Sequence, residues 1–154
     1  MVLLCLFFRI GPCDFLVAAE GSPAKIIKVL PHFLDKEGRK SLSPSLYERD
    51  AYQVVLRKDR TQCSALRYDI QWKATGLAKS AEKPRLRLEL RTTKGSSSET
   101  TRMEQAVVPR SWGSRWSAIT LDGKIFEEVG EVSAWRVTLN QGDKTLAEQK
   151  SFLW

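Results

Sequence analysis

Hydrophobic and polar residues alternate with a period of two along several stretches of the chain. The clearest of these are residues 66–73, 85–91 and 134–139. Because successive side chains of a strand point to opposite faces, this spacing places one set of residues on a buried face and the other set in water. The pattern predicts a protein of half-buried strands whose outer faces carry many cations. The inward-facing set consists of Leu66, Tyr68, Ile70, Trp72, Leu86, Leu88, Leu90, Trp135, Val137 and Leu139.

Glycine, proline and small polar residues divide the rest of the chain into further short strands. The polar segment 94–101 is typical of a hairpin tip, and tight turns are expected at 122–123 and 140–143. Short strands at fairly regular spacing favour a two-sheet antiparallel sandwich. The predicted strands are 24–35, 66–73, 85–91, 102–108, 115–121, 131–139 and 144–153.

One segment has the periodicity of a helix. Residues 41–60 are predicted to form a helix that starts either after Ser43, with Pro44 in the first turn, or at Ser45, whose spacing to Glu48 is that of a capping box. A strand through the same segment is the competing interpretation. An apolar helical face favours the helix, and it consists of Tyr47, Ala51, Val54 and Val55.

The segment 116–154 carries a fold-level resemblance. It contains a strand, a crossover with Phe126 and Gly130, a strand with the sequence Ala-Trp-Arg-Val at 134–137, a tight turn and a final strand. This succession resembles the last three strands of an immunoglobulin-like or fibronectin-type-III-like domain, although the cysteine pair of true immunoglobulin domains is absent. The whole chain is similar to small exported bacterial β-sandwich proteins of unknown function. The resemblance implies a mainly β, two-sheet antiparallel immunoglobulin-like sandwich with one short helix, and it supplies no active-site residues.

The first nineteen residues differ in character from the rest of the chain. They contain two apolar runs and end in small residues, a pattern typical of a secretory leader. We therefore expect residues 1–19 to be a signal peptide cleaved after Ala19. The remaining residues, 20–154, are then one exported β-sandwich domain of ordinary globular composition, with a periplasmic or extracellular location.

Charges and cysteines near the start of the chain limit two further features. Arg9 and Asp14 fall inside the apolar window, so a membrane span is not expected there. Removal of the leader would also remove Cys5 and Cys13, which leaves Cys63 without an internal disulfide partner. The core alone would then have to stabilise the domain.

The formal net charge of +7 gives the chain an affinity for polyanions, although solubility is the simpler and favoured explanation of this charge. Two candidate binding surfaces follow from it. One is a loop in which Trp112 lies between Arg110 and Arg115, where an exposed indole could stack on a sugar ring; the alternative is an indole folded over the end of the sandwich. The other is a cationic sheet face, which requires strands 66–73 and 85–91 to pair, and which Asp69 and Glu89 could partly neutralise. Its cations are Arg67, Lys73, Arg85, Arg87 and Arg91.

Candidate catalytic residues are few. The chain has a single histidine, His32, which could form a Ser-His-Asp arrangement with Asp35 nearby, but no Gly-x-Ser-x-Gly elbow is present. No multi-histidine or thiolate zinc site and no phosphate-binding glycine loop can be assembled, and no cofactor is expected. Trp72, Trp116 and Trp135 are expected in the core.

These observations predict a non-catalytic interaction module that binds a protein or cell-envelope partner through loops or an exposed strand edge. The alternative is a carbohydrate- or polyanion-binding domain that uses the loop tryptophan and the arginine-rich face, with an acidic glycan as its partner. Nucleic acid is not an expected partner of an exported protein. An enzyme centred on His32 is a third, less favoured hypothesis.

Overall fold

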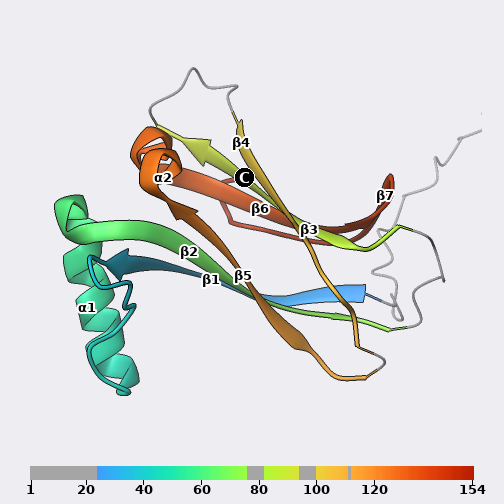
Figure 1. Ribbon diagram of the computed structural model, residues 1–154, viewed down its shortest axis with the longest axis horizontal. Helices are drawn as coiled ribbons and strands as arrows, with labels where there is room; N and C mark the ends of the chain where they lie inside the picture. Colours follow the sequence, from blue (N-terminus) through green and yellow to red (C-terminus); the bar gives the residue numbers. More distant parts are fainter. Residues whose placement is uncertain (1–23, 76–81, 94–99, 111) are drawn as a thin grey trace, which may run out of the picture.

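Seven strands form two antiparallel sheets in a computed structural model that describes residues 24–75, 82–93, 100–110 and 112–154 (Figure 1). The first sheet has the order β1-β2-β5. It consists of β1 (Ala24–Asp35), β2 (Cys63–Ala74) and β5 (Arg115–Asp122). The second sheet has the order β4-β3-β6-β7. It consists of β3 (Arg85–Thr92), β4 (Thr100–Ala106), β6 (Val132–Gln141) and β7 (Lys144–Lys150).

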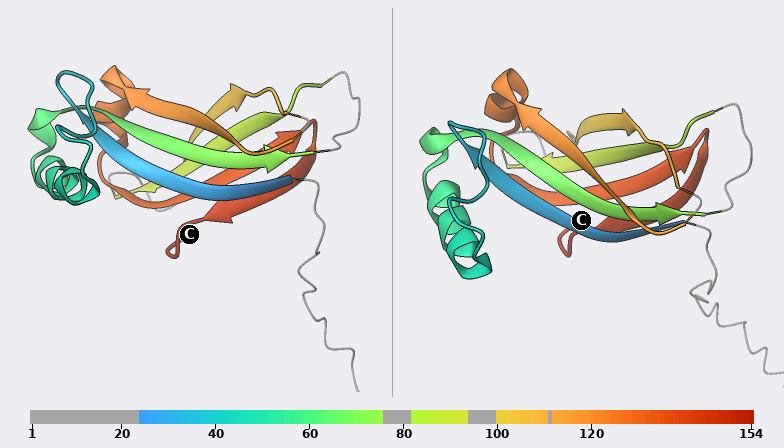
Figure 2. Two further views of the ribbon diagram at one scale, coloured as in Figure 1. Left: turned by 90° about the horizontal axis from the view of Figure 1, so that it is seen from below. Right: turned by 60° about the horizontal axis from the view of Figure 1, so that its bottom comes forward.

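The two sheets lie face to face and share one hydrophobic core (Figure 2). The inward-facing residues of β2 and the leucines of β3 are almost completely buried and belong to the same cluster of packed side chains. Alternation therefore assigns the faces correctly. The largest fully buried side chains are Trp72, Tyr68, Leu56, Ile70, Leu86, Leu88, Leu90, Leu121, Leu139 and Val137.

The strand order confirms the predicted immunoglobulin-like sandwich. In immunoglobulin-like domains strands A, B and E share one sheet, and strands C, F and G form the other. Here β1, β2 and β5 occupy the first set of positions, while β3, β6 and β7 occupy the second, with β4 added at the free edge of β3.

The strand pairing that the cationic sheet face requires is not formed. Strands β2 and β3 lie in different sheets, because β2 pairs with β1 and β5, whereas β3 pairs with β4 and β6. Both strands have one apolar face, and these faces pack against each other across the core. The two strands thus face each other, and their polar residues lie on opposite outer surfaces of the sandwich.

The predicted helix is present as α1 (Leu46–Lys58), followed by a 3-10 turn at Arg60–Gln62. The second of the two predicted starts is correct, since the Ser45 hydroxyl accepts a hydrogen bond from the Glu48 amide. A second helix, α2 (Gly123–Val129), was not predicted; it buries Phe126 in the crossover between β5 and β6. Within the described ranges, no helix has the length and hydrophobicity required to cross a membrane.

The apolar face predicted for α1 is not the buried one. Tyr47 is 84% exposed, Val54 and Val55 are also exposed, and the buried residues are Gln53 and Leu56. The helix meets the edge of the sandwich at strand β1, where the polar backbone of the strand requires hydrogen-bonding partners. A glutamine therefore occupies the contact that a hydrophobic residue occupies in most helices.

Gln53 ties the helix to the sheet. Its Oε1 accepts the Phe33 amide at 2.8 Å, and its Nε2 donates to the carbonyls of Phe33 and Lys40, each at 2.9 Å. The side-chain amide thereby pairs with β1 in the way that a neighbouring strand would. The same hydrogen bonds hold the loop 36–45, which carries Lys40, against the outer face of the first sheet.

We expect Gln53→Ala to lower the free energy of unfolding by about 1–3 kcal/mol, because three backbone groups lose a partly buried partner. Urea denaturation would measure the loss, and hydrogen exchange should accelerate in α1. Tyr47→Ala on the exposed side of the same helix is the matched control, with an expected change below about 0.5 kcal/mol. Equal effects of the two substitutions would contradict this role of Gln53.

Candidate functional site

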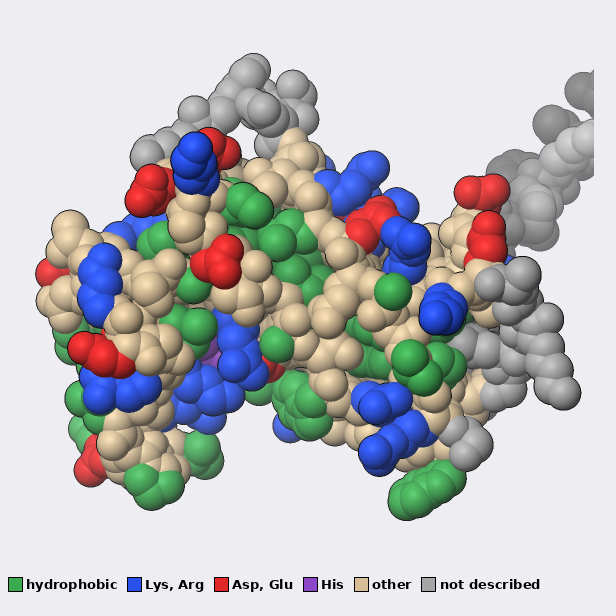
Figure 3. All heavy atoms as spheres, in the orientation of Figure 1, with side chains coloured by type: hydrophobic (Ala, Val, Ile, Leu, Met, Phe, Trp, Pro, Cys, Tyr) green, Lys and Arg blue, Asp and Glu red, His purple; other side chains and the backbone are tan. Residues whose placement is uncertain are grey.

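A pocket of about 300 Å³ lies on the outer face of the first sheet, beside α1. We call it the His32 pocket. Lysine and arginine side chains gather on this side of the molecule, between α1 and the sheet (Figure 3). Its lining residues come from all three strands of the sheet, from α1 and from the loop 36–45. They are Leu30, His32, Lys40, Arg49, Arg67, Asp69, Trp116, Ser117 and Ala118.

Strand register brings the pocket residues together. His32 of β1 lies opposite Arg67 of β2, and Asp69 of β2 lies opposite Leu30 on one side and Ala118 of β5 on the other. Alternation turns all of them toward the same outer face of the sheet. The strands thus form the floor of the pocket.

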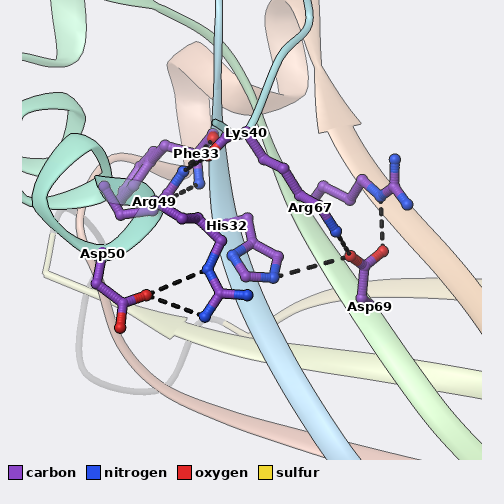
Figure 4. Close-up of polar contacts among 8 residues, drawn as sticks. His32, Phe33, Lys40, Arg49, Asp50, Arg67 and Asp69 are labelled. Atoms are coloured by element: carbon purple, nitrogen blue, oxygen red, sulfur yellow. Dashed lines mark hydrogen bonds and ion pairs between the residues drawn. The ribbon is translucent and has the colours of Figure 1, made fainter. Parts of the chain in front are cut away.

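The Asp69 carboxylate lies at the centre of the polar contacts (Figure 4). The Lys40 ammonium donates to it at 2.9 Å and Arg67 Nε donates at 2.7 Å, whereas His32 Nε2 lies 3.8 Å away. Burial alone would raise the pKa of Asp69, but the hydrogen bonds from Lys40 and Arg67 lower it overall. Asp69 is therefore ionised and holds the two cations in fixed positions.

Burial and the neighbouring cations keep His32 neutral at pH 7. Desolvation lowers the pKa of His32, and the charges of Lys40, Arg49 and Arg67 lower it further against the opposing effect of Asp69. The histidine thus contributes a neutral polar wall to the pocket under these conditions.

Cations outnumber anions in the His32 pocket. Lys40, Arg49 and Arg67 line it together with one carboxylate, and Arg49 also pairs with the exposed Asp50 at 3.0 Å. A hollow on the other sheet, of about 560 Å³, is lined instead by three cations and three anions. A surplus of positive charge therefore distinguishes the His32 pocket from that hollow.

The hydrogen bonds of a Ser-His-Asp triad are not formed in the described part of the chain. Asp35 bonds to Arg39 and Tyr52 rather than to His32. Ser117 lines the pocket, but its hydroxyl accepts the indole N–H of Trp72 at 3.0 Å. A triad requires the histidine to hydrogen-bond to both partners, and among the described residues neither Asp35 nor Ser117 bonds to His32.

The structure divides the sheet face predicted as one cationic patch. Arg67 lies in the His32 pocket, whereas Arg85, Arg87 and Arg91 lie on the outer face of the second sheet, because β2 and β3 belong to different sheets. Lys73 remains with Arg67 on the first sheet. The predicted continuous patch does not exist.

Acidic or aromatic side chains contact the arginines on the outer face of the second sheet. Arg85 and Arg87 pair with Glu104, and the buried Glu89 binds Arg102 at 3.0 Å and Arg136 at 2.7 Å. Glu89 therefore does not neutralise the arginines that the sequence placed around it, since its partners Arg102 and Arg136 come from the neighbouring strands β4 and β6. Stacking completes the arrangement, since the guanidinium carbons of Arg91 and Arg136 lie 4.4 and 4.8 Å from the centroid of the Trp154 ring.

The second predicted surface, the loop around Trp112, is exposed in part. Trp112 is 77% exposed, so the interpretation of an indole folded over the end of the sandwich is wrong. Arg110 is exposed, while Arg115 donates to the Val108 carbonyl and thereby braces the loop. The ligand-facing role of these three residues stays a prediction.

Trp116 was predicted to be buried and is not. It is 52% exposed and lines the His32 pocket. Parity along β5 could have revealed this, because Ile119 and Leu121 are buried and Trp116 has the opposite parity. Its size suggested the core, but its position on the strand places it outside.

Two of the pocket cations, Lys40 and Arg49, were not predicted at all. They come from a loop and a helix, and only the tertiary contact of α1 with β1 brings them to the sheet. Among the described residues, no group of three or more His, Cys, Asp or Glu side chains could hold a metal ion. The predicted leader, residues 1–19, and most of the predicted hairpin tip lie outside the described residues.

The chain was compared with known proteins in three ways. A scan against family models found no match, and searches of curated proteins and of solved structures found none either.

Proposed function

We propose that this protein is a non-catalytic, exported binding module and that its His32 pocket binds an acidic glycan of the cell envelope. The observation that carries the proposal is the convergence of Lys40, Arg49 and Arg67 around one carboxylate, with the exposed Trp116 beside them. This combination joins the two hypotheses drawn from the sequence, because an acidic glycan is both a polyanion and an envelope component.

The cations are suited to carboxylate or sulfate groups. Arg67 uses only its Nε for Asp69, which leaves its terminal guanidinium nitrogens as a planar pair of donors. Lys40 contributes a partly exposed ammonium group whose other hydrogens can meet a ligand. Because Asp69 already fixes both side chains, little side-chain entropy is lost when an anion binds.

Trp116 supplies the second element of sugar recognition. An exposed indole offers a flat apolar face on which a sugar ring can stack, while the nearby cations meet its acidic substituents. Leu30 extends this apolar part of the pocket wall. Cationic groups and an aromatic platform on one side of the sandwich fit a charged ring better than a bare inorganic anion.

The test is retention on an immobilised acidic polysaccharide, with heparin as the sulfated probe and polygalacturonate as the carboxylated probe. We expect the wild type to be retained at low salt and released as salt rises. Arg67→Gln and Lys40→Gln should each weaken binding about tenfold, since each removes a charge-assisted hydrogen bond to the ligand. Trp116→Ala should weaken binding to both probes.

The matched control is Arg85→Gln. It removes the same charge from an arginine on the opposite outer face and should leave retention nearly unchanged. An equal loss in Arg85→Gln and Arg67→Gln would mean that net charge rather than the His32 pocket holds the polysaccharide. That result would overturn the proposal.

A further inference from the structure

A second cavity, of about 710 Å³, lies beside β1 at the end of the sandwich that carries α1. Both α1 and α2 stand at this end (Figure 2). Its apolar lining residues include Phe33 of β1, Leu66 and Tyr68 of β2 and Trp135 of β6. Its volume is that of a small-molecule site, and its lining combines apolar with charged side chains. We call it the inter-sheet cavity.

The inter-sheet cavity is separate from the His32 pocket. Leu30 and His32 of β1 line the pocket on the outer face, whereas Pro31 and Phe33, which alternate with them, line the cavity. A ligand in one site therefore does not occupy the other, and this inference does not depend on the proposed glycan binding.

A buried hydroxyl group lines the cavity without a protein partner. Tyr68 is only 1% exposed, and no residue in the described ranges forms a hydrogen bond with its hydroxyl. The other tyrosine at this end, Tyr52, donates to Asp35 at 2.8 Å, and the buried indole of Trp72 donates to Ser117. The Tyr68 hydroxyl is therefore free to donate to an acceptor that enters the cavity.

Positive charge lies along the rim. Arg57 and Lys58, in the last turn of α1, are exposed and line the cavity, and no ion pair forms with either of them within the described ranges. Arg60 bonds to the backbone carbonyls of Phe126 and Gly130, so its charge is not matched by a carboxylate in those bonds. Glu131 is the one acidic residue among the lining residues. The rim therefore carries a net positive charge.

From these observations we infer that the inter-sheet cavity binds an amphipathic monocarboxylic acid of the fatty-acid type. The hydrocarbon chain packs against Phe33, Leu66 and Trp135, where it leaves water. The carboxylate accepts the hydrogen bond of the Tyr68 hydroxyl, and the charges of Arg57 and Lys58 at the rim stabilise it. The occupant thus matches both the apolar wall and the positive rim.

The experiment is a calorimetric titration of the full chain with decanoate, accompanied by the fluorescence of the tryptophans. We expect saturable binding of decanoate and weaker binding of decanol, which has the same chain without the charge. Tyr68→Phe keeps the ring and removes only the hydroxyl, so the affinity for decanoate should fall about three- to tenfold.

Two further variants separate the roles of charge and space. The double variant Arg57→Gln/Lys58→Gln should weaken decanoate at low salt and leave decanol unchanged, whereas the control Lys83→Gln/Arg85→Gln, at a different hollow, should change neither. Val132→Trp, at a half-buried position of the wall, should block both ligands.

The inference is overturned if decanoate does not bind saturably below millimolar concentration, or if Tyr68→Phe and Val132→Trp, both shown to be folded by thermal unfolding, bind it like the wild type. Equal affinities for decanol and decanoate would overturn the assignment of an acid. Arg67→Gln tests the two sites independently. It should weaken glycan binding at the His32 pocket and leave decanoate binding unchanged.

Discussion

Trp72→Ala is expected to lower the free energy of unfolding by about 3–5 kcal/mol, the largest effect of any single substitution considered. The ring is 1% exposed and packs in the core shared by the two sheets. Its removal leaves a cavity that rigid strands on both sides cannot fill, and the Ser117 hydroxyl loses the indole donor at 3.0 Å. Urea denaturation at neutral pH, followed by far-UV circular dichroism, would measure the change.

Trp116→Ala is the matched control, because it removes the same side chain from the next strand of the same sheet. Trp116 is 52% exposed on the outer face, so its loss should change the free energy of unfolding by less than about 0.5 kcal/mol. A loss comparable to that of Trp72→Ala would show that Trp116 is a packing residue. The His32 pocket would then lack the free aromatic wall that the proposed glycan binding requires.

Alternation predicted the strands well because burial on one face is a local property of the chain. Strand β1 has the predicted bounds, 24–35, and the leucines of β3 are fully buried as expected. The bounds of a strand and the face that it buries depend only on residues a few positions apart. The number of strands and the sandwich class follow from such local decisions together with turn spacing.

Pairing between strands could not be predicted in the same way. The apolar faces of β2 and β3 are compatible both with neighbours in one sheet and with partners across the core, and alternation does not distinguish these two arrangements. The choice depends on the whole topology. The error mattered for function, since it joined Arg67 with Arg85, Arg87 and Arg91 in one patch that the fold divides.

The surroundings of α1 show a second limit. Hydrophobic spacing predicted a buried face with Tyr47 and Val54, but the helix rests on the backbone edge of β1, where the amide of Gln53 is the better partner. The end of the chain is a further example. Phe152 is 100% exposed, whereas Trp154 stacks on Arg91 and Arg136. In both places the chemistry of the contacted surface decides which side chain makes the contact.

Local sequence patterns predict some features of the His32 pocket, and the tertiary structure determines the others. Parity along the strands is sufficient to place His32, Arg67 and Trp116 on outer faces, but their meeting in one pocket requires the register of three strands. Lys40 and Arg49 join them only because Gln53 docks the helix and its preceding loop. The helix and its preceding loop thus add walls to a pocket whose floor is the sheet.

A buried carboxylate at the end of β1 anchors the loop that leads to α1. Asp35 accepts hydrogen bonds from the Glu37 amide at 3.0 Å, from the amide and Nε of Arg39 at 2.8 Å each, and from the Tyr52 hydroxyl at 2.8 Å. Burial alone would raise the pKa of Asp35, but these hydrogen bonds lower it to about 2. The ionised form of Asp35 is therefore strongly preferred in the folded state.

This preference makes stability depend on pH at the acidic end. Because the pKa of Asp35 is depressed on folding, its contribution is fully present above the ordinary value of 3.8 and is lost as the pH falls toward 2. We expect Asp35→Asn to lower the free energy of unfolding at pH 7 by about 1–2 kcal/mol. The difference between wild type and variant should shrink below pH 4 and nearly vanish at pH 2.

Urea denaturation of both proteins between pH 7 and pH 2 would test this expectation. Asp69 and Glu89 also have lowered pKa values, and His32 gains a proton in acid, so the wild-type curve alone combines several groups. The difference between the two proteins isolates Asp35. If it stays constant from pH 7 to pH 2, the ionised carboxylate of Asp35 does not hold the loop, and Lys40 is held by its contacts with Gln53 and Asp69 alone.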